Sequence, residues 1–187
     1  MALPILTRFA AGNGGPWRID RIAAARGETL AAAPRLAVVT EPTVPPADSA
    51  WRLTGSTGHA RYTTRQENAA LAAIQAGLGR AEATCAALIP IRKSAAWWDL
   101  AQDERRAIFE ESSHHIAIGL EYLPAIARRL YHCRELGEPF DFLTWFEYAP
   151  NHREAFEELV GRLRRTEEWA YVDREVDIRL AREPLAF

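Results

Sequence analysis

The stretch from Ser112 to Tyr148, SSHHIAIGLEYLPAIARRLYHCRELGEPFDFLTWFEY, decides the fold of this 187-residue chain. Its segments ARRLYHC (127–133) and PFDFLTWFEY (139–148) predict two strands. Side chains alternate along a strand, so each strand groups three side chains on one face: Arg128, Leu130 and His132 in the first, and Phe142, Thr144 and Phe146 in the second.

Helical spacing flanks this pair of strands. One predicted helix runs from about Trp98 to Glu111 and another from about His152 to Arg165. Four apolar side chains of the second helix fall on one face: Phe156, Leu159, Val160 and Leu163. The segment WAYVDREVDIRL, residues 169–180, then predicts the final strand.

The first half of the chain shows a related pattern. We expect strands in WRIDRIAAA (17–25) and RLAVVTE (35–41), a loop over 41–50, a hairpin or pair of strands around Gly55 and Gly58 within 50–65, a helix over 66–79, and a buried strand in CAALIPI (85–91). Strand–helix–strand thus occurs twice, at about 51–91 and 140–181. This predicts an α+β fold of two related halves, residues 1–92 and 93–187, in one compact structural unit.

Composition excludes several classes of partner. The 23 basic residues are balanced by 25 acidic ones, and a formal charge of −2 is not the footprint of a nucleic-acid-binding protein. No stretch approaches eighteen apolar residues, so we expect no membrane partner. Cys85 and Cys133 form no ligand or disulfide pattern, and the N-terminus lacks the features of a signal peptide, so we expect free thiols and a cytoplasmic location.

One lysine stands among the basic residues, and it precedes a tryptophan pair in KSAAWWDL. Lys93 lies four positions before Trp97, and the other twenty-two basic side chains are arginines. A compact ammonium differs from a planar guanidinium wherever only a point donor fits. The chain also has five histidines, and a single histidine is in general a surface or core residue rather than a ligand: His59, His114, His115, His132 and His152.

Several fragments in a fixed order resemble the haem-dependent chlorite dismutase family. They are the lysine with the tryptophan pair, a histidine thirteen residues before the first arginine of RRLYH, the segment DFLTWFE, and the Glu-Trp pair of TEEWAYVDREV. The resemblance covers roughly residues 90–181, with weaker support from RYTTRQE at 61–67. It implies two ferredoxin-like halves that form a β-barrel with outer helices, haem b as cofactor, and, for so short a chain, a homodimer.

The resemblance also implies roles for individual residues. His115 would be the axial ligand of the iron, with Glu168 and Lys93 in the hydrogen-bond network behind it. The substrate side would be formed by Arg128, Leu130, Thr144 and Phe146. Trp97 would lie beside the haem, Trp98 near a subunit contact, and Tyr62 would bond a haem propionate. Glu167 neighbours Glu168, and if both lie in a strand only one of them reaches the core side.

The activity that the resemblance implies is the decomposition of chlorite to chloride and dioxygen, with formation of the O–O bond. Arg128 would hold the anionic chlorine species through charge-assisted hydrogen bonds. Three alternatives stay open. One is a coprohaem decarboxylase, whose branch of the family lacks the distal arginine. The second is a peroxidase-like haem protein, and the third is a dimer without turnover, with or without haem.

Overall fold

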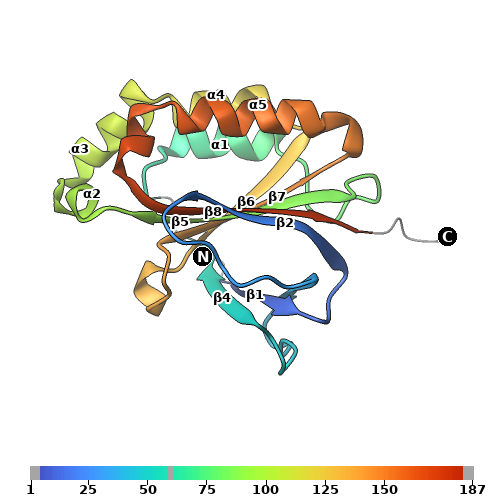
Figure 1. Ribbon diagram of the computed structural model, residues 1–187. Helices are drawn as coiled ribbons and strands as arrows, with labels where there is room; N and C mark the ends of the chain where they lie inside the picture. Colours follow the sequence, from blue (N-terminus) through green and yellow to red (C-terminus); the bar gives the residue numbers. More distant parts are fainter. Residues whose placement is uncertain (1–4, 59–60, 183–187) are drawn as a thin grey trace.

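The computed structural model describes residues 5–58 and 61–182. Within them, eight antiparallel strands close into a barrel in the order β1-β3-β2-β8-β5-β7-β6-β4 (Figure 1). The strands are β1 (Leu6–Gly12), β2 (Trp17–Arg26), β3 (Arg35–Thr40), β4 (Trp51–Ser56), β5 (Cys85–Lys93), β6 (Ile126–His132), β7 (Phe142–Tyr148) and β8 (Val172–Ala181). Closure leaves every strand with two neighbours, so the sheet has no open edge.

The strand order confirms the expected pair of ferredoxin-like halves. Along the barrel, β8-β5-β7-β6 places the fourth, first, third and second strands of the second half side by side, and β4-β1-β3-β2 gives the same order for the first half. The boundary predicted at residues 92 and 93 falls within β5 (Cys85–Lys93). Because β5 pairs with both β7 and β8, it belongs by topology with the strands of the second half.

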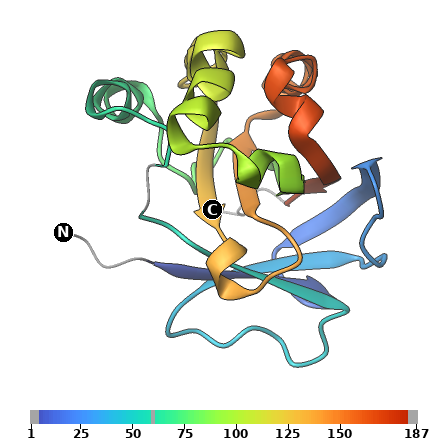
Figure 2. The same ribbon diagram turned by 90° about the vertical axis from the view of Figure 1, so that its left-hand side faces the viewer.

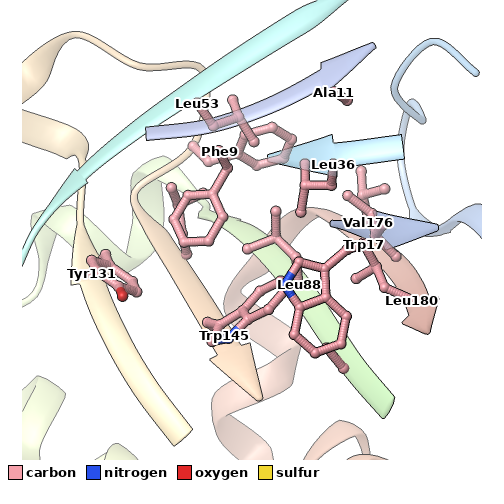
Figure 3. Packing of buried hydrophobic residues seen from close by; sticks show 14 of the residues in the cluster. Phe9, Ala11, Trp17, Leu36, Leu53, Leu88, Tyr131, Trp145, Val176 and Leu180 are labelled. Atoms are coloured by element: carbon pink, nitrogen blue, oxygen red, sulfur yellow. The ribbon is translucent and has the colours of Figure 1, made fainter. Parts of the chain in front are cut away.

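Large side chains fill the interior of the barrel. Phe9, Trp17, Leu88 and Trp145 gather there from four different strands (Figure 3). The rings of Trp17 and Trp145 meet edge to face, with centroids 5.3 Å apart. Such contacts add to the stabilisation from buried apolar area. The barrel interior is therefore a packed core, and a ligand site has to lie on the outer face of the sheet.

Three helices cover one outer face of the sheet (Figures 1 and 2). They are α1 (Arg65–Ile74), α4 (His115–Glu121) and α5 (Arg153–Arg164). The apolar face predicted for α5 is confirmed, because Phe156, Leu159, Val160 and Leu163 are all buried. No helix within the described ranges is both long and apolar enough to cross a membrane.

The helix predicted over 98–111 is not continuous. The chain forms α2 (Ala95–Asp99), α3 (Gln102–Arg106) and a π-helical segment (Ala107–Ser112) in its place. Leu100 and Ala101 are both extended, and the Glu104 carboxylate accepts a hydrogen bond from the Ala101 N–H at the start of α3. A capping contact that restarts the helix therefore overrides helical spacing here.

Other boundaries also differ from the prediction. Among the described residues of 50–65, which are 50–58 and 61–65, β4 is the only strand, and residues 61–64 lead into α1, so the second strand of the predicted hairpin or strand pair is absent from this part of the chain. The helix predicted to reach residue 79 ends at Ile74, since the next residue, Gln75, is extended. Residues 167–171 form a 3₁₀ turn before β8, whereas β1 and α4 were not anticipated.

Candidate functional site

A cavity of about 460 Å³ lies between the three helices and the sheet. This volume is within the range of cofactor and small-ligand sites. Strands β5, β6 and β7 contribute one wall, and α1, α4 and α5 contribute the other. The apolar part of this lining includes Ile89, Ile91, Phe146, Leu159, Val160 and Leu163.

His115 is the first residue of α4, and the segment before it fixes its direction. His114 adopts the left-handed conformation, with φ 53°, and makes no side-chain cap. The Glu110 carboxylate caps the helix in its place, because it accepts hydrogen bonds from the N–H groups of Ile116 (2.6 Å) and Ala117 (3.2 Å). The turn at His114 thus presents the next imidazole, that of His115, to the cavity.

A buried carboxylate holds one nitrogen of this imidazole. His115 Nδ1 lies 2.6 Å from Glu168 Oε2, and Lys93 Nζ lies 2.7 Å from Glu168 Oε1. The Glu168 backbone N–H also donates to Ser113 Oγ. With Nδ1 donating to the carboxylate, the lone pair of Nε2 is available to a ligand in the cavity.

Opposing effects set the ionisation of the buried pair. Burial raises the pKa of Glu168, but the interactions with His115 and Lys93 outweigh it and lower that pKa to about 2. Burial lowers the pKa of Lys93, and the charge of Glu168 opposes this change. Glu168 lies in the 3₁₀ turn Glu167–Tyr171, so the strand alternation used to choose between the two glutamates does not apply. Glu168 is nevertheless buried and Glu167 exposed.

Aromatic rings surround this network, and two of them carried no role in the sequence analysis. The rings of Phe109 and Trp169 lie nearly parallel to the imidazole of His115, with centroids 4.4 and 6.1 Å away. The Lys93 ammonium lies 4.5 Å from the ring centroid of Trp97 and 5.5 Å from that of Trp169. Only the Glu-Trp pair in the sequence could have indicated Trp169, and nothing distinguished Phe109.

Arg128 carries an unpaired charge into the same cavity. Its Nε is buried without a hydrogen-bond partner, and in the part of the chain that the structure describes its guanidinium makes no ion pair. Burial lowers the pKa of this arginine. Gly119 of α4 lies beside the group, and a Cβ there would be at van der Waals distance, 3.7 Å, from Arg128 Nη2. An unpaired buried charge is costly, which favours an anionic ligand.

Three further predicted residues line the cavity beside Arg128. Phe146 is buried, Thr144 is half-buried and Leu130 is 41% exposed. All three share the outer face of β6 and β7 with Arg128, as the strand alternation predicts. Tyr131, one position along from Leu130, points into the barrel core instead.

The remaining predicted residues lie around the cavity. Tyr62 lines it, and the Tyr62 hydroxyl is buried without a partner. Trp97 is fully buried and lies one layer behind, edge-on to Tyr62 with ring centroids 5.8 Å apart. Trp98 is half-buried, donates to Asp141 Oδ2 and has the Arg134 guanidinium 3.9 Å from its ring centroid.

The chain is similar in sequence and fold to known proteins. The family model for chlorite dismutase matches residues 39–183. The dimeric chlorite dismutase of Nitrobacter winogradskyi is similar in structure, with 63% identity, a TM-score of 0.88, and coverage of 95% of this chain and 99% of that one. The chlorite dismutase of Candidatus Nitrospira defluvii in complex with imidazole shares the fold at 20% identity, with a TM-score of 0.68 over 96% and 91% of the two chains.

A match to a curated protein covers a shorter segment. The chlorite dismutase of Ideonella dechloratans is 35% identical over 84 residues, which make up 45% of this chain. The match spans 27% of the length of that relative.

Proposed function

The chain belongs to the chlorite dismutase family of enzymes, and from this premise we propose that it is a haem b enzyme that decomposes chlorite to chloride and dioxygen. One observation carries the proposal: the guanidinium of Arg128, whose Nε is buried without a partner, shares a cavity with an imidazole whose Nδ1 is fixed by a carboxylate. The first group suits an anion and the second suits a metal.

The residues of the cavity fit a haem. His115 Nε2 supplies a single donor, and the apolar side chains of β5 and α5 supply the dry walls that a porphyrin requires. The orphaned hydroxyl of Tyr62 supplies a donor for a carboxylate such as a propionate. When bound, the haem iron supplies the redox chemistry that takes an oxygen atom from chlorite and returns it in dioxygen.

On the ligand side, Glu168 holds the proton on His115 Nδ1 and makes the imidazole a stronger electron donor. Lys93 keeps this carboxylate ionised and in place, because its ammonium contacts the oxygen that His115 does not use. Ser113 accepts from the Glu168 backbone and fixes the turn. The three groups orient the imidazole before any cofactor binds.

On the substrate side, Arg128 binds the anion and retains the chlorine-containing fragment until the O–O bond forms. A charge-assisted hydrogen bond is about twice as strong as a neutral one, and a guanidinium stays charged at working pH. The walls formed by Leu130, Thr144 and Phe146 keep bulk water away from this contact, which strengthens it.

The test is dioxygen release from chlorite, measured with an oxygen electrode on haem-loaded protein. Arg128→Ala removes a charged hydrogen bond of about 1.5–3 kcal/mol, so turnover falls about ten- to hundredfold while haem stays bound. His115→Ala instead loses the cofactor or its normal ligation, seen in the Soret band. Arg92→Ala, an exposed arginine of β5, is the matched control and keeps wild-type turnover. Wild-type dioxygen release by Arg128→Ala would overturn the proposal.

We also propose a homodimer in a reducing compartment such as the cytoplasm. The structure from Nitrobacter winogradskyi is described as dimeric, and this chain is similar to it over nearly its whole length. Cys85 and Cys133 are both free and buried, which suits a reducing environment. Light scattering on the purified holoprotein measures the mass directly, and a monomer at micromolar concentration contradicts the assembly.

A further inference from the structure

A second buried carboxylate, Glu175 of β8, lies beside the site without contacting His115. The side chain is 2% exposed and lines the same cavity. Its two oxygens have different partners. Oε1 accepts from Arg164 Nε at 2.8 Å, and Oε2 accepts from Trp169 Nε1 at 2.8 Å. A buried carboxylate persists when such charged and neutral donors compensate its desolvation.

The indole that Glu175 holds is the one that lies along the imidazole. The rings of Trp169 and His115 are inclined by only 21°, with centroids 6.1 Å apart. Glu168 fixes the position of His115 Nδ1, and rotation of the ring about its remaining axis depends on the rings packed nearly parallel to it, those of Phe109 at 4.4 Å and Trp169 at 6.1 Å. A ring packed parallel to the imidazole restricts that rotation, provided that its own plane is fixed.

Two contacts fix the plane of Trp169. Its Nε1–H points to Glu175, and Arg164 of α5 in turn binds Glu175 and also Asp177, at 2.9 Å. The Lys93 ammonium lies 5.5 Å from the Trp169 ring centroid, so the same indole also borders the cation that pairs with Glu168. The indole of Trp169 therefore lies beside both the His115 imidazole and the Lys93 ammonium.

We propose that Glu175 is a positioning residue for the axial imidazole: through Trp169 it fixes the ring plane of His115 and thereby slows loss of the haem. The inference rests on the proposed haem ligation by His115. The experiment must distinguish this role from a purely structural one, in which Arg164, Glu175 and Asp177 only join α5 to β8.

The experiment measures haem transfer from ferric holoprotein to excess apomyoglobin, together with the iron–histidine stretch of the ferrous protein by resonance Raman. We expect Glu175→Gln to lose haem about tenfold faster and to broaden the iron–histidine band, since one charged hydrogen bond is weakened. Trp169→Phe gives the same change, and the double variant is no worse than either single one. Asp177→Asn, which removes the other partner of Arg164, stays at the wild-type rate.

Each of these results would overturn the proposal: wild-type haem loss in Glu175→Gln, additive effects in the double variant, or equally fast loss in Asp177→Asn. If Glu175→Gln does not fold, Trp169→Phe alone decides, because it removes the N–H and leaves Glu175 paired with Arg164. Wild-type haem loss by that variant also overturns it. Failure of the proposed haem ligation gives a different result. If His115 does not bind the iron, the wild-type spectrum contains no iron–histidine band that disappears in His115→Ala.

Discussion

At the scale of single residues, the charged groups of the site differ in whether they have a partner. Glu168 and Lys93 compensate each other, but Arg128 has no such partner in the described chain. Replacing an uncompensated buried charge with an apolar side chain is in general stabilising. Residues of a binding site can therefore lower the stability of the fold, and the effect of Arg128 on the free energy of unfolding can be measured.

We predict that Arg128→Leu raises the free energy of unfolding of the haem-free protein by about 1–2 kcal/mol, because it removes the desolvated guanidinium. Urea denaturation followed by circular dichroism measures the change. Arg92→Leu, at the one exposed position of β5, is the matched control, and its effect stays within about 0.5 kcal/mol. A clear loss of stability in Arg128→Leu would mean that the arginine already has a stabilising partner.

The single lysine of the chain occupies a place that suits a point charge. The Lys93 ammonium lies within 5.5 Å of two indole rings and 2.7 Å from Glu168. We predict that Lys93→Arg lowers the free energy of unfolding by about 1–3 kcal/mol, because the larger planar group overpacks this space. Thermal denaturation of the haem-free protein measures it, and unchanged stability would contradict the steric argument.

Residue patterns made much of the site predictable, and the limits are physical. Strand alternation grouped Arg128 with Leu130 and Thr144 with Phe146, the resemblance joined the two pairs, and all four line the cavity. Phe109 was missed because it lies on a π-helical turn, whose irregular geometry leaves no periodic signal. The resemblance selected Glu168 over Glu167, and burial agrees, although the turn that contains them is not a strand.

At the scale of elements, α1 is the least firmly packed wall of the cavity. It has no buried residue, and its two ends are held by polar contacts. Arg106 of α3 pairs with Glu67 at the start of α1, with Nη2–Oε1 at 2.6 Å. At the other end Gln75 Nε2 donates to the Arg128 carbonyl at 2.7 Å. Helical spacing predicted α1 but not these attachments, because side-chain pairs between distant segments leave no local pattern.

The Glu67–Arg106 pair gives a pH-dependent prediction. The hydrogen bond from Arg106 lowers the pKa of Glu67 from 4.5 to about 2. A lowered carboxylate pKa stabilises the fold above the unfolded value and loses this stabilisation as the pH falls through the folded value. We therefore expect Glu67→Gln to lower the free energy of unfolding by about 1 kcal/mol at pH 7. The difference in this free energy between the variant and the wild type then decreases as the pH falls from about 4.5 to 2.

Glutamine isolates the ion pair from the helix cap. Glu67 also accepts from the Thr64 N–H in a capping box, and a glutamine at this position can do the same. Thr64→Ala removes only the side-chain contact of the cap, which lowers the pKa of Glu67 less than Arg106 does, so its cost follows a shallower pH course. Urea denaturation at a series of pH values gives both curves. A difference in the free energy of unfolding between Glu67→Gln and the wild type that does not change with pH would contradict the proposed role of the Glu67–Arg106 ion pair.

At the scale of the whole molecule, closure of the barrel depends on its narrowest seam. β4 and β6 are joined by one residue pair, Ser56 with His132, whereas β6 and β7 pair over seven positions. Gly55 lies beside this seam, where a Cβ would be 2.5 Å from Tyr131 Cβ. The sequence pattern assigned Gly55 to a hairpin or a pair of strands, since a glycine needed for close strand approach cannot be distinguished locally from a turn glycine.

We predict that Gly55→Ala lowers the free energy of unfolding by about 2 kcal/mol, because β4 and β6 must separate and Tyr131 must leave its edge contact with Phe9. Gly77→Ala is the matched control, because a Cβ at Gly77 meets nothing within 4 Å and its cost stays below about 0.5 kcal/mol. Hydrogen exchange locates the effect, and we expect faster exchange in β4 and β6 than in β5 and β8. Equal destabilisation by the two alanines, or faster exchange spread evenly over the barrel, would show that the seam does not limit closure.

Because β6 carries Tyr131 on the barrel side and Arg128 on the cavity side, a shift of this strand also displaces the anion-binding group, so turnover falls together with stability.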